Sequence, residues 1–204
     1  MVPFAACPVM PSNDFCSARI YELRKDCPDQ ETLRGASEGI SLKAMERMLL
    51  TAIAMERYGQ EYYRWFSESI SDRKGKSMMK GLANDEKEHE GIMSKEYEKQ
   101  CGKAPPEEIG IDIGEKTVKE VFSQERKKGE KDIIAKILKL GIEIEQKSID
   151  FYSSESKTVK SAKMKSLLEK LTEIEKGHKA LLEENLFHMR QDGAWWGYTP
   201  ILDG

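Results

Sequence analysis

The chain has 204 residues, of which 34% are charged and 39% hydrophobic, and its formal net charge at pH 7 is −3. This length suffices for one well-buried core, and the weakly acidic balance lacks the basic footprint of a nucleic-acid-binding protein. No apolar stretch reaches the roughly 18 residues of a membrane-spanning helix, and the N-terminal sequence MVPFAACPVM lacks the charged start of a secretory signal. We therefore expect a cytoplasmic protein that binds neither nucleic acid nor membranes.

The first 37 residues are rich in proline and cysteine and show little periodicity. We predict an irregular arm over residues 1–37, with one short helix near residues 17–25. The cysteines of the chain form no C-x-x-C pair, which excludes a rubredoxin-type or zinc-ribbon site. Those in the arm are either free thiols of a reducing compartment or carry a redox or metal role. The four are Cys7, Cys16, Cys27 and Cys101.

Strong helical periodicity begins after the arm and recurs in four segments. Ser71 is predicted to cap the second helix, and Gly102 to end it. A crossover over residues 102–129, with a short helix near residues 117–127, then leads to the second pair of helices. The four long helices are predicted over residues 41–69, 71–100, 130–156 and 159–189.

Short turns join the helices within each pair, and one long crossover joins the two pairs. Short turns make antiparallel neighbours, and a single long crossover is the ferritin-like variant of the four-helix bundle. We therefore predict an all-α fold, with a ferritin-like antiparallel four-helix bundle over residues 38–190 and a tail over residues 191–204. The apolar residues of the tail either dock a partner or cover a bundle end or a dimer interface. These residues are Trp195, Trp196, Tyr198 and Ile201.

The two helical pairs repeat each other. A shift of 89 residues superposes them, and the first glutamate of each pair precedes the second by 30 residues in both copies. Such agreement indicates a duplicated helical hairpin. The aligned polar residues are Glu56 with Glu145, Glu86 with Glu175, His89 with His178, and Tyr63 with Tyr152.

Each repeated glutamate or histidine lies on the apolar face of its helix. Glu56, for example, continues the three- and four-residue spacing of Leu49 and Ala52. Burying four uncompensated carboxylates in one core is too costly, whereas two divalent cations supply the four balancing charges. Spacing of three residues also places Glu and His on one helical face. We predict a two-metal site formed by Glu56, Glu86, His89, Glu145, Glu175 and His178.

Carboxylates with one imidazole per metal suit Fe(II) or Mn(II) better than Zn(II) or copper, so we expect two iron ions, with manganese as the alternative. Gly59 and Ser148 lie one turn beyond the single glutamates and are expected to leave room for metal, water or an oxygen species. His188 lies off the apolar face and is expected to be exposed. Tyr63 and Tyr152 are either core aromatics or hydrogen-bond donors to a carboxylate ligand.

With these motifs, residues 41–189 resemble the rubrerythrin branch of the ferritin-like superfamily. The single-Glu helices carry ERYGQEYY at 56–63 and EQKSIDFY at 145–152, and the Glu-x-x-His helices carry LANDEKEH at 82–89 and LTEIEKGH at 171–178. The resemblance implies a di-iron peroxidase or oxidase with one histidine per metal. It also implies that Glu56 and Glu145 are terminal ligands and that Glu86 and Glu175 bridge the two metals.

Two departures from the family pattern affect the expected function. The chain has no rubredoxin module, so electrons are expected from a separate donor such as a rubredoxin-like protein. The carboxylate that rubrerythrins usually carry one turn along a single-Glu helix is replaced by Gly59 and Ser148, so peroxidase activity does not carry over directly. Our hypothesis is a homodimeric di-iron oxidoreductase that reduces hydrogen peroxide or dioxygen. The alternatives are a ferroxidase or iron-storage protein, and a non-catalytic metal-binding interaction bundle.

Overall fold

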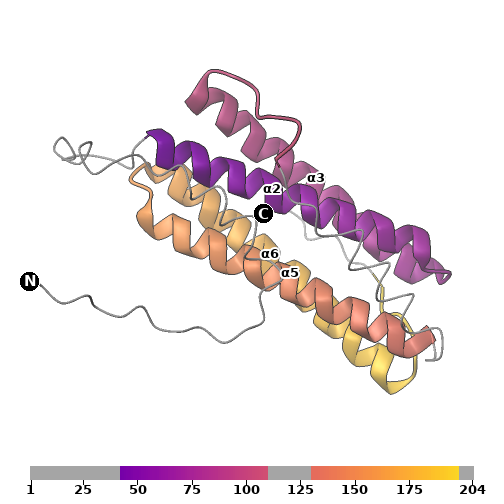
Figure 1. Ribbon diagram of the computed structural model, residues 1–204. Coiled ribbons are helices and arrows are strands. Elements are labelled where there is room, and N and C mark those ends of the chain that lie inside the picture. Colours follow the sequence, from indigo (N-terminus) through magenta and orange to yellow (C-terminus); the bar gives the residue numbers. More distant parts are fainter. Residues whose placement is uncertain (1–41, 110–129, 198–204) are drawn as a thin grey trace, which may run out of the picture. The chain divides into compact units, whose positions relative to one another are not determined.

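The computed structural model describes residues 42–109 and 130–197, most of which belong to four helices (Figure 1). The described segments contain no strand, which confirms the all-α class, and none of their helices meets the length and apolarity of a membrane span. The helices are α2 (Leu42–Ser69), α3 (Arg73–Cys101), α5 (Glu130–Thr158) and α6 (Ala162–Gln191).

Several predictions fall outside the described residues. These are the irregular arm, the short helices near residues 17–25 and 117–127, and the part of the tail that contains Tyr198 and Ile201. The predicted domain boundaries stay predictions.

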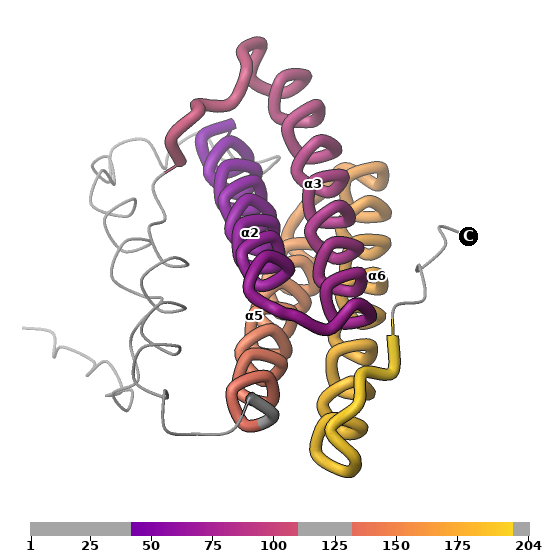
Figure 2. The backbone as a smooth tube through the Cα atoms, turned by 90° about the vertical axis from the view of Figure 1, so that its right-hand side faces the viewer, coloured from indigo at the N-terminus to yellow at the C-terminus, as the bar shows by residue number. Residues whose placement is uncertain are grey.

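All four helices belong to one structural unit, residues 37–204. Helix α2 packs along α3, α5 packs along α6, and α2 also contacts α5. Figures 1 and 2 show α2 and α3 as one hairpin and α5 and α6 as a second hairpin beside it. The bundle of two hairpins that the turn lengths predicted is therefore present.

The helix ends follow local chemistry. The Asp72 carboxylate accepts hydrogen bonds from the backbone N–H groups of Lys74 and Gly75, at 2.8 and 2.9 Å, and so caps α3. The prediction that Ser71 is the cap was wrong by one residue, because the Asp72 carboxylate satisfies both N–H groups. Helix α3 ends, as predicted, at Gly102, whose φ of 68° lies in the left-handed region that glycine adopts without strain.

The second hairpin turns slightly later than predicted. Helix α5 continues to Thr158, and α6 begins at Ala162 rather than at Val159. The Ser161 hydroxyl accepts a 3.3 Å hydrogen bond from the Met164 N–H and caps α6. Val159 instead lies in the turn and is buried.

Two clusters of buried apolar side chains form the core, one toward each end of the bundle. One includes Tyr63 and Phe66 of α2 and Leu138 of α5. The other includes Leu49 of α2 and Leu168 of α6. Each fully buried aliphatic side chain of this kind contributes about 1.5–3 kcal/mol to folding. The middle of the four helices, between the two clusters, is where the predicted metal ligands lie.

The described part of the tail covers an end of the bundle. Trp195 is buried and packs directly over Gly75, near the start of α3. Trp196 stacks on His188 with ring centroids 4.5 Å apart and remains 61% exposed. His188, expected to be exposed, is only partly so: its side chain is 23% exposed, and Trp196 stacks on its ring.

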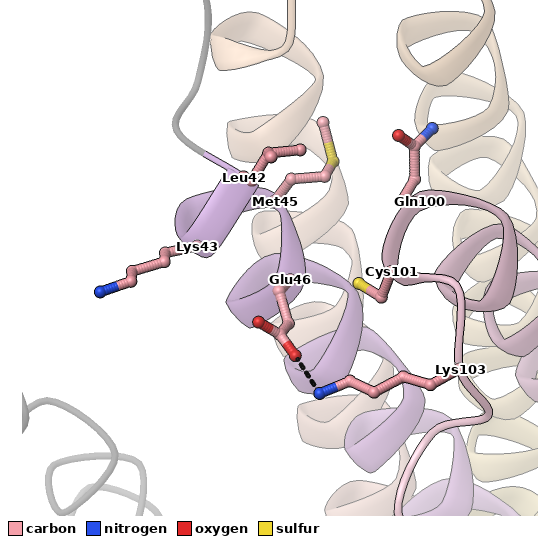
Figure 3. A pocket seen from close by; sticks show the side chains of 7 residues that line it. All are labelled: Leu42, Lys43, Met45, Glu46, Gln100, Cys101 and Lys103. Atoms are coloured by element: carbon pink, nitrogen blue, oxygen red, sulfur yellow. Dashed lines mark ion pairs between the residues drawn. The ribbon is translucent and has the colours of Figure 1, made fainter.

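A pocket of about 240 Å³ lies between the start of α2 and the end of α3 (Figure 3). Lys103 forms an ion pair with Glu46 across it at 3.0 Å, and the Tyr97 hydroxyl donates a 2.9 Å hydrogen bond to the same carboxylate. None of the six predicted metal ligands lines this pocket, so it is separate from the site described next.

Candidate metal centre

The structure brings the six predicted ligands together at mid-length of the bundle. Each helix contributes from the face that its apolar spacing turns inward, and all six residues are at most 4% exposed. Helix α2 supplies Glu56, α3 supplies Glu86 and His89, α5 supplies Glu145, and α6 supplies Glu175 and His178.

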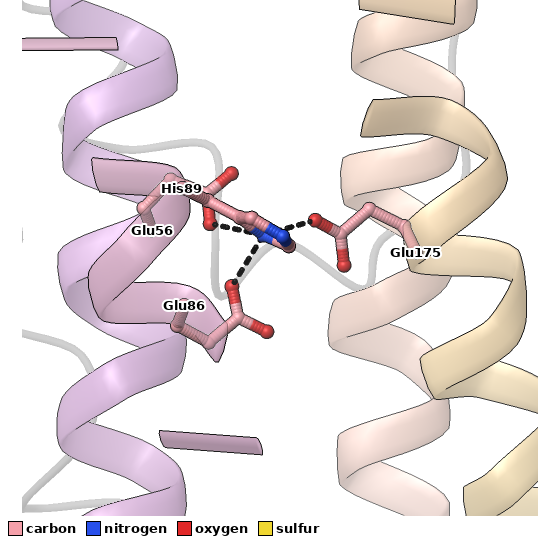
Figure 4. A group of neighbouring side chains, drawn as sticks. All are labelled: Glu56, Glu86, His89 and Glu175. Atoms are coloured by element: carbon pink, nitrogen blue, oxygen red, sulfur yellow. Dashed lines mark ion pairs between the residues drawn. The ribbon is translucent and has the colours of Figure 1, made fainter. Parts of the chain in front are cut away.

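The six side chains form two overlapping groups, and in each group the donor atoms lie within 4.8 Å of one another. We call them the His89 group and the His178 group. Figure 4 shows the His89 group, in which carboxylates from α2, α3 and α6 point at one imidazole. Glu86 and Glu175 belong to both groups. The His89 group is completed by Glu56, and the His178 group by Glu145.

The two shared glutamates offer a different oxygen to each group. Oε2 of Glu86 lies 3.8 Å from Nδ1 of His89, whereas its Oε1 lies 3.4 Å from Nδ1 of His178. Oε1 of Glu175 lies 3.0 Å from Nδ1 of His89, whereas its Oε2 lies 3.1 Å from Nδ1 of His178. A carboxylate that presents one oxygen to each group is placed to bridge two cations.

The two unshared glutamates complete one group each. Oε2 of Glu56 lies 3.4 Å from Nδ1 of His89, and Oε2 of Glu145 lies 3.8 Å from Nδ1 of His178. The two imidazole rings are stacked, with centroids 5.6 Å apart. Both groups therefore use Nδ1 of the histidine, and the site has approximate two-fold symmetry that matches the repeat in the sequence.

Burial and mutual repulsion change the proton affinities of the carboxyl groups. Burial, followed by the charge of Glu175, raises the pKa of Glu145 to about 8, and the same two causes raise the pKa of Glu86 well above its usual range. Burial also disfavours the ionised form of Glu175. Contacts of this carboxylate with His178 and His89 outweigh burial and lower the pKa of Glu175. The protein chain alone thus retains protons on part of the cluster.

The two histidines hold their protons strongly because negatively charged carboxylates surround them. Burial disfavours the charged imidazole of His89, but its contacts with Glu175, Glu56 and Glu86 outweigh burial and raise its pKa to about 12. The pKa of His178 is also raised well above its usual range, because Asp85 and the clustered carboxylates outweigh the burial. Both imidazoles must lose a proton from Nδ1 before they can bind a metal.

The donor atoms suit divalent cations. Within the described part of the chain, five buried side-chain atoms have no hydrogen-bond partner: Trp195 Nε1, His178 Nε2 and, in the His89 group, Glu56 Oε2, Glu175 Oε1 and His89 Nδ1. The last three face one another. Buried polar atoms are normally satisfied, and a cation among these three would satisfy all of them. The donors are carboxylate oxygens and one imidazole nitrogen per group, a set that fits Fe(II) or Mn(II).

Two tyrosines orient the unshared glutamates across the bundle. The Tyr63 hydroxyl donates a hydrogen bond to Oε1 of Glu145, and the Tyr152 hydroxyl donates one to Oε1 of Glu56. Of the two alternatives left open by the sequence, the hydrogen bond to a carboxylate is therefore the one observed. Because each tyrosine occupies Oε1, the Oε2 atom of the same carboxylate faces the histidine.

A family model described as Rubrerythrin matches residues 47–186, more than half of the 204-residue chain. The chain belongs to the rubrerythrin family. Among solved structures it is similar to the hypothetical protein Pfu-1136390-001 from Pyrococcus furiosus, with a TM-score of 0.58 and 24% identity. That similarity covers 77% of this chain and 100% of the other, and at this identity it shows the fold alone. No curated protein matches the chain.

Membership of the rubrerythrin family agrees with the ferritin-like bundle and, together with the buried cluster, points to a metal site. The structure corrects one expectation about the position where rubrerythrins usually carry a further carboxylate. Gly59 does not leave open space, because a Cβ atom there would lie 3.1 Å from Cδ of Glu86. The absence of a side chain at Gly59 instead allows Glu86 to lie against α2.

Asp85 was not among the predicted site residues. Its Oδ2 lies 3.4 Å from Nε2 of His178, on the side of the imidazole that faces away from the shared carboxylates. The three- and four-residue spacing from Leu82 through Asp85 to His89 was the available signal, because it places position 85 on the inward face of α3.

Proposed function

We propose that this protein is a di-iron oxidoreductase that reduces hydrogen peroxide or dioxygen, with electrons from a separate donor such as a rubredoxin-like protein. The observation that supports the proposal is the division of Glu86 and Glu175, each of which presents one oxygen to each histidine group. Two cations held by the same two carboxylates are neighbours, as a shared two-electron reaction requires.

The remaining ligands give each cation a similar environment. Glu56 and His89 would hold one cation, and Glu145 and His178 the other. Two divalent ions carry four positive charges, which balance the four carboxylates once the histidines are neutral. This balance and the oxygen-rich donor set favour iron, with manganese as the alternative.

When bound, two ferrous ions supply two electrons, the number that converts hydrogen peroxide and two protons into two water molecules. The protein side chains prepare the site for this reaction. Tyr63 and Tyr152 hold Glu145 and Glu56 by one oxygen each, so the other oxygen is already directed inward. The apolar clusters on either side exclude bulk water from the charged layer. A homodimeric assembly and a cytoplasmic location are part of the same proposal.

The test is the oxidation of ferrous protein. Protein loaded with Fe(II) without oxygen is mixed with hydrogen peroxide or with oxygenated buffer, and the near-ultraviolet absorbance of ferric iron is followed. We expect oxidation much faster than that of free Fe(II) in the same buffer, and we expect the gain to disappear in the Glu86→Ala/Glu175→Ala variant. A parent protein that binds iron but is oxidised no faster than free Fe(II) contradicts the proposal.

A further inference from the structure

The two histidines of the metal centre differ in what lies behind their rings. Nδ1 of His178 faces the shared carboxylates, and its buried Nε2 faces Oδ2 of Asp85 at 3.4 Å. The His178 side chain is fully buried, whereas that of Asp85 is 27% exposed. For His89, the carboxylates of the described segments that approach the ring within 4 Å all lie near Nδ1.

The sequence repeat explains why His89 differs. The shift of 89 residues that aligns the two hairpins places Ile174 at the position of Asp85. Ile174 is partly buried and packs against the apolar cluster that contains Met93 and Leu168. An isoleucine cannot accept a hydrogen bond or attract a cation, so the duplication has lost, or never had, a second carboxylate at this position.

We propose that Asp85 is a positioning residue that makes the two metal positions unequal, so that the His178 group binds a cation first and more tightly than the His89 group. The inference rests on the proposed two-metal site. The Asp85 carboxylate lies at ion-pair distance from Nε2, the ring nitrogen that faces away from the cluster, and so attracts positive charge to that side of the ring while Nδ1 faces the metal position. It also makes the imidazole a stronger donor, and such partners change metal affinity by about 10- to 100-fold.

The charge of Asp85 acts in the same direction. Asp85 lies 3.4 Å from the histidine of the His178 group, and Coulomb attraction falls with distance. Both effects favour the same position. At limiting metal, the protein therefore carries a single ion in the His178 group.

The test is a titration of the full-length, metal-free protein with Co(II), which is not oxidised under these conditions and reports its coordination through visible absorption. Calorimetry should resolve two binding steps whose affinities differ by at least about tenfold. Asp85→Asn keeps the shape of the side chain and removes its charge. It should weaken the tighter step by about 10- to 100-fold, so that the two steps merge while two ions per chain still bind.

The matched control is Glu169→Gln, which removes one negative charge from a 55% exposed side chain on α6. This variant should keep both steps. A merely structural role of Asp85 would lower the melting temperature without changing the separation between the steps, so thermal unfolding of all variants is measured in parallel. Ile174→Asp, which supplies the missing carboxylate beside His89, should strengthen the weaker step.

A second pair of variants assigns the order. His89→Ala should remove the weaker step and keep the tighter one, whereas His178→Ala should remove the tighter one. Equal binding steps in the parent protein, an unchanged separation in Asp85→Asn, or a tight step that depends on His89 would each overturn the inference.

The outcomes separate this inference from the proposed function. Equal steps together with fast peroxide oxidation would overturn the inequality alone. Unequal steps that depend on Asp85, together with slow oxidation, would contradict the oxidoreductase proposal alone. No bound cobalt at all would overturn both, because both require the two-metal site.

Discussion

At the scale of single residues, the site depends on hydrogen bonds that cross from one hairpin to the other. Tyr63 of α2 orients Glu145 of α5, and Tyr152 of α5 orients Glu56 of α2. All four side chains are at most 1% exposed, so water cannot replace a lost hydroxyl group easily. Each tyrosine therefore couples the position of one carboxylate to the packing of the other hairpin.

We expect Tyr152→Phe to destabilise the protein by about 1–3 kcal/mol, because Oε1 of Glu56 loses its donor while remaining buried. The same change should weaken metal binding, since Glu56 becomes free to turn. Chemical denaturation and a Co(II) titration measure the two effects. Tyr97→Phe, which removes a hydrogen bond to the partly exposed Glu46, is the control and should leave metal binding unchanged. Equal metal affinity in Tyr152→Phe and the parent protein would contradict the orienting role.

Gly59→Ala tests the close approach of Glu86 to α2. The new Cβ atom would lie 3.1 Å from Cδ of Glu86, so the carboxylate must shift by a few tenths of an ångström. We expect weaker binding of at least one metal ion, in spite of a gain in helix propensity of about 1 kcal/mol. Gly91→Ala on α3 is the matched control, because nothing lies within 4 Å of its added Cβ atom. Metal binding that is equal in the two variants would show that Glu86 adapts without cost.

At the scale of helices, side-chain caps define the start of the two Glu-x-x-His helices. Asp72 caps α3, which carries Glu86 and His89. Ser161 caps α6, which carries Glu175 and His178. The two caps differ in strength, because Asp72 accepts from two backbone N–H groups and Ser161 from one.

Asp72→Ala is therefore expected to cost more than Ser161→Ala, within the usual range of about 0.5–2 kcal/mol for a lost N-cap. Urea denaturation of the metal-free protein measures both. The order of the two variants is the test, and a larger loss in Ser161→Ala would mean that the carboxylate cap of α3 contributes less than its two hydrogen bonds indicate.

At the scale of the whole molecule, the buried charges link folding to pH. Burial raises the pKa of Glu145 from the usual 4.5 to about 8, and the carboxylates around His89 raise its pKa from 6.5 to about 12. In both cases the folded state keeps its proton up to a higher pH than the unfolded state does. The resulting stability is complete below the unfolded pKa and is lost as pH rises toward the folded pKa.

The metal-free protein should therefore lose stability as pH rises, from about 4.5 to about 8 because of Glu145 and from about 6.5 toward 12 because of His89. Metal should bind more tightly over the same range, because bound cations displace these protons. Melting temperatures with and without Co(II) measure both trends, and calorimetry in buffers of different ionisation enthalpy measures the protons released. Binding without proton release would show that the cluster is already deprotonated.

Helical periodicity and the duplication determined much of this picture. The spacing around Glu56, Glu86 and His89, repeated 89 residues later, was sufficient to predict four helices, their inward faces and the six residues that meet at mid-length. This was possible because the face of a helix on which a residue lies depends only on local spacing. The role of these residues as metal ligands stays a prediction, as do the electron donor, the assembly and the cellular location.

Only the tertiary structure decided which atoms meet. Three features join different helices. Glu86 and Glu175 each present one oxygen to each histidine group. The hydroxyl groups of Tyr63 and Tyr152 donate hydrogen bonds across the bundle, and Asp85 approaches His178. Such contacts depend on the rotation and separation of packed helices, and small changes in either move side chains by the length of a hydrogen bond. Periodicity specifies which side of a helix faces inward, whereas interhelical packing selects the partner that each side chain finds there.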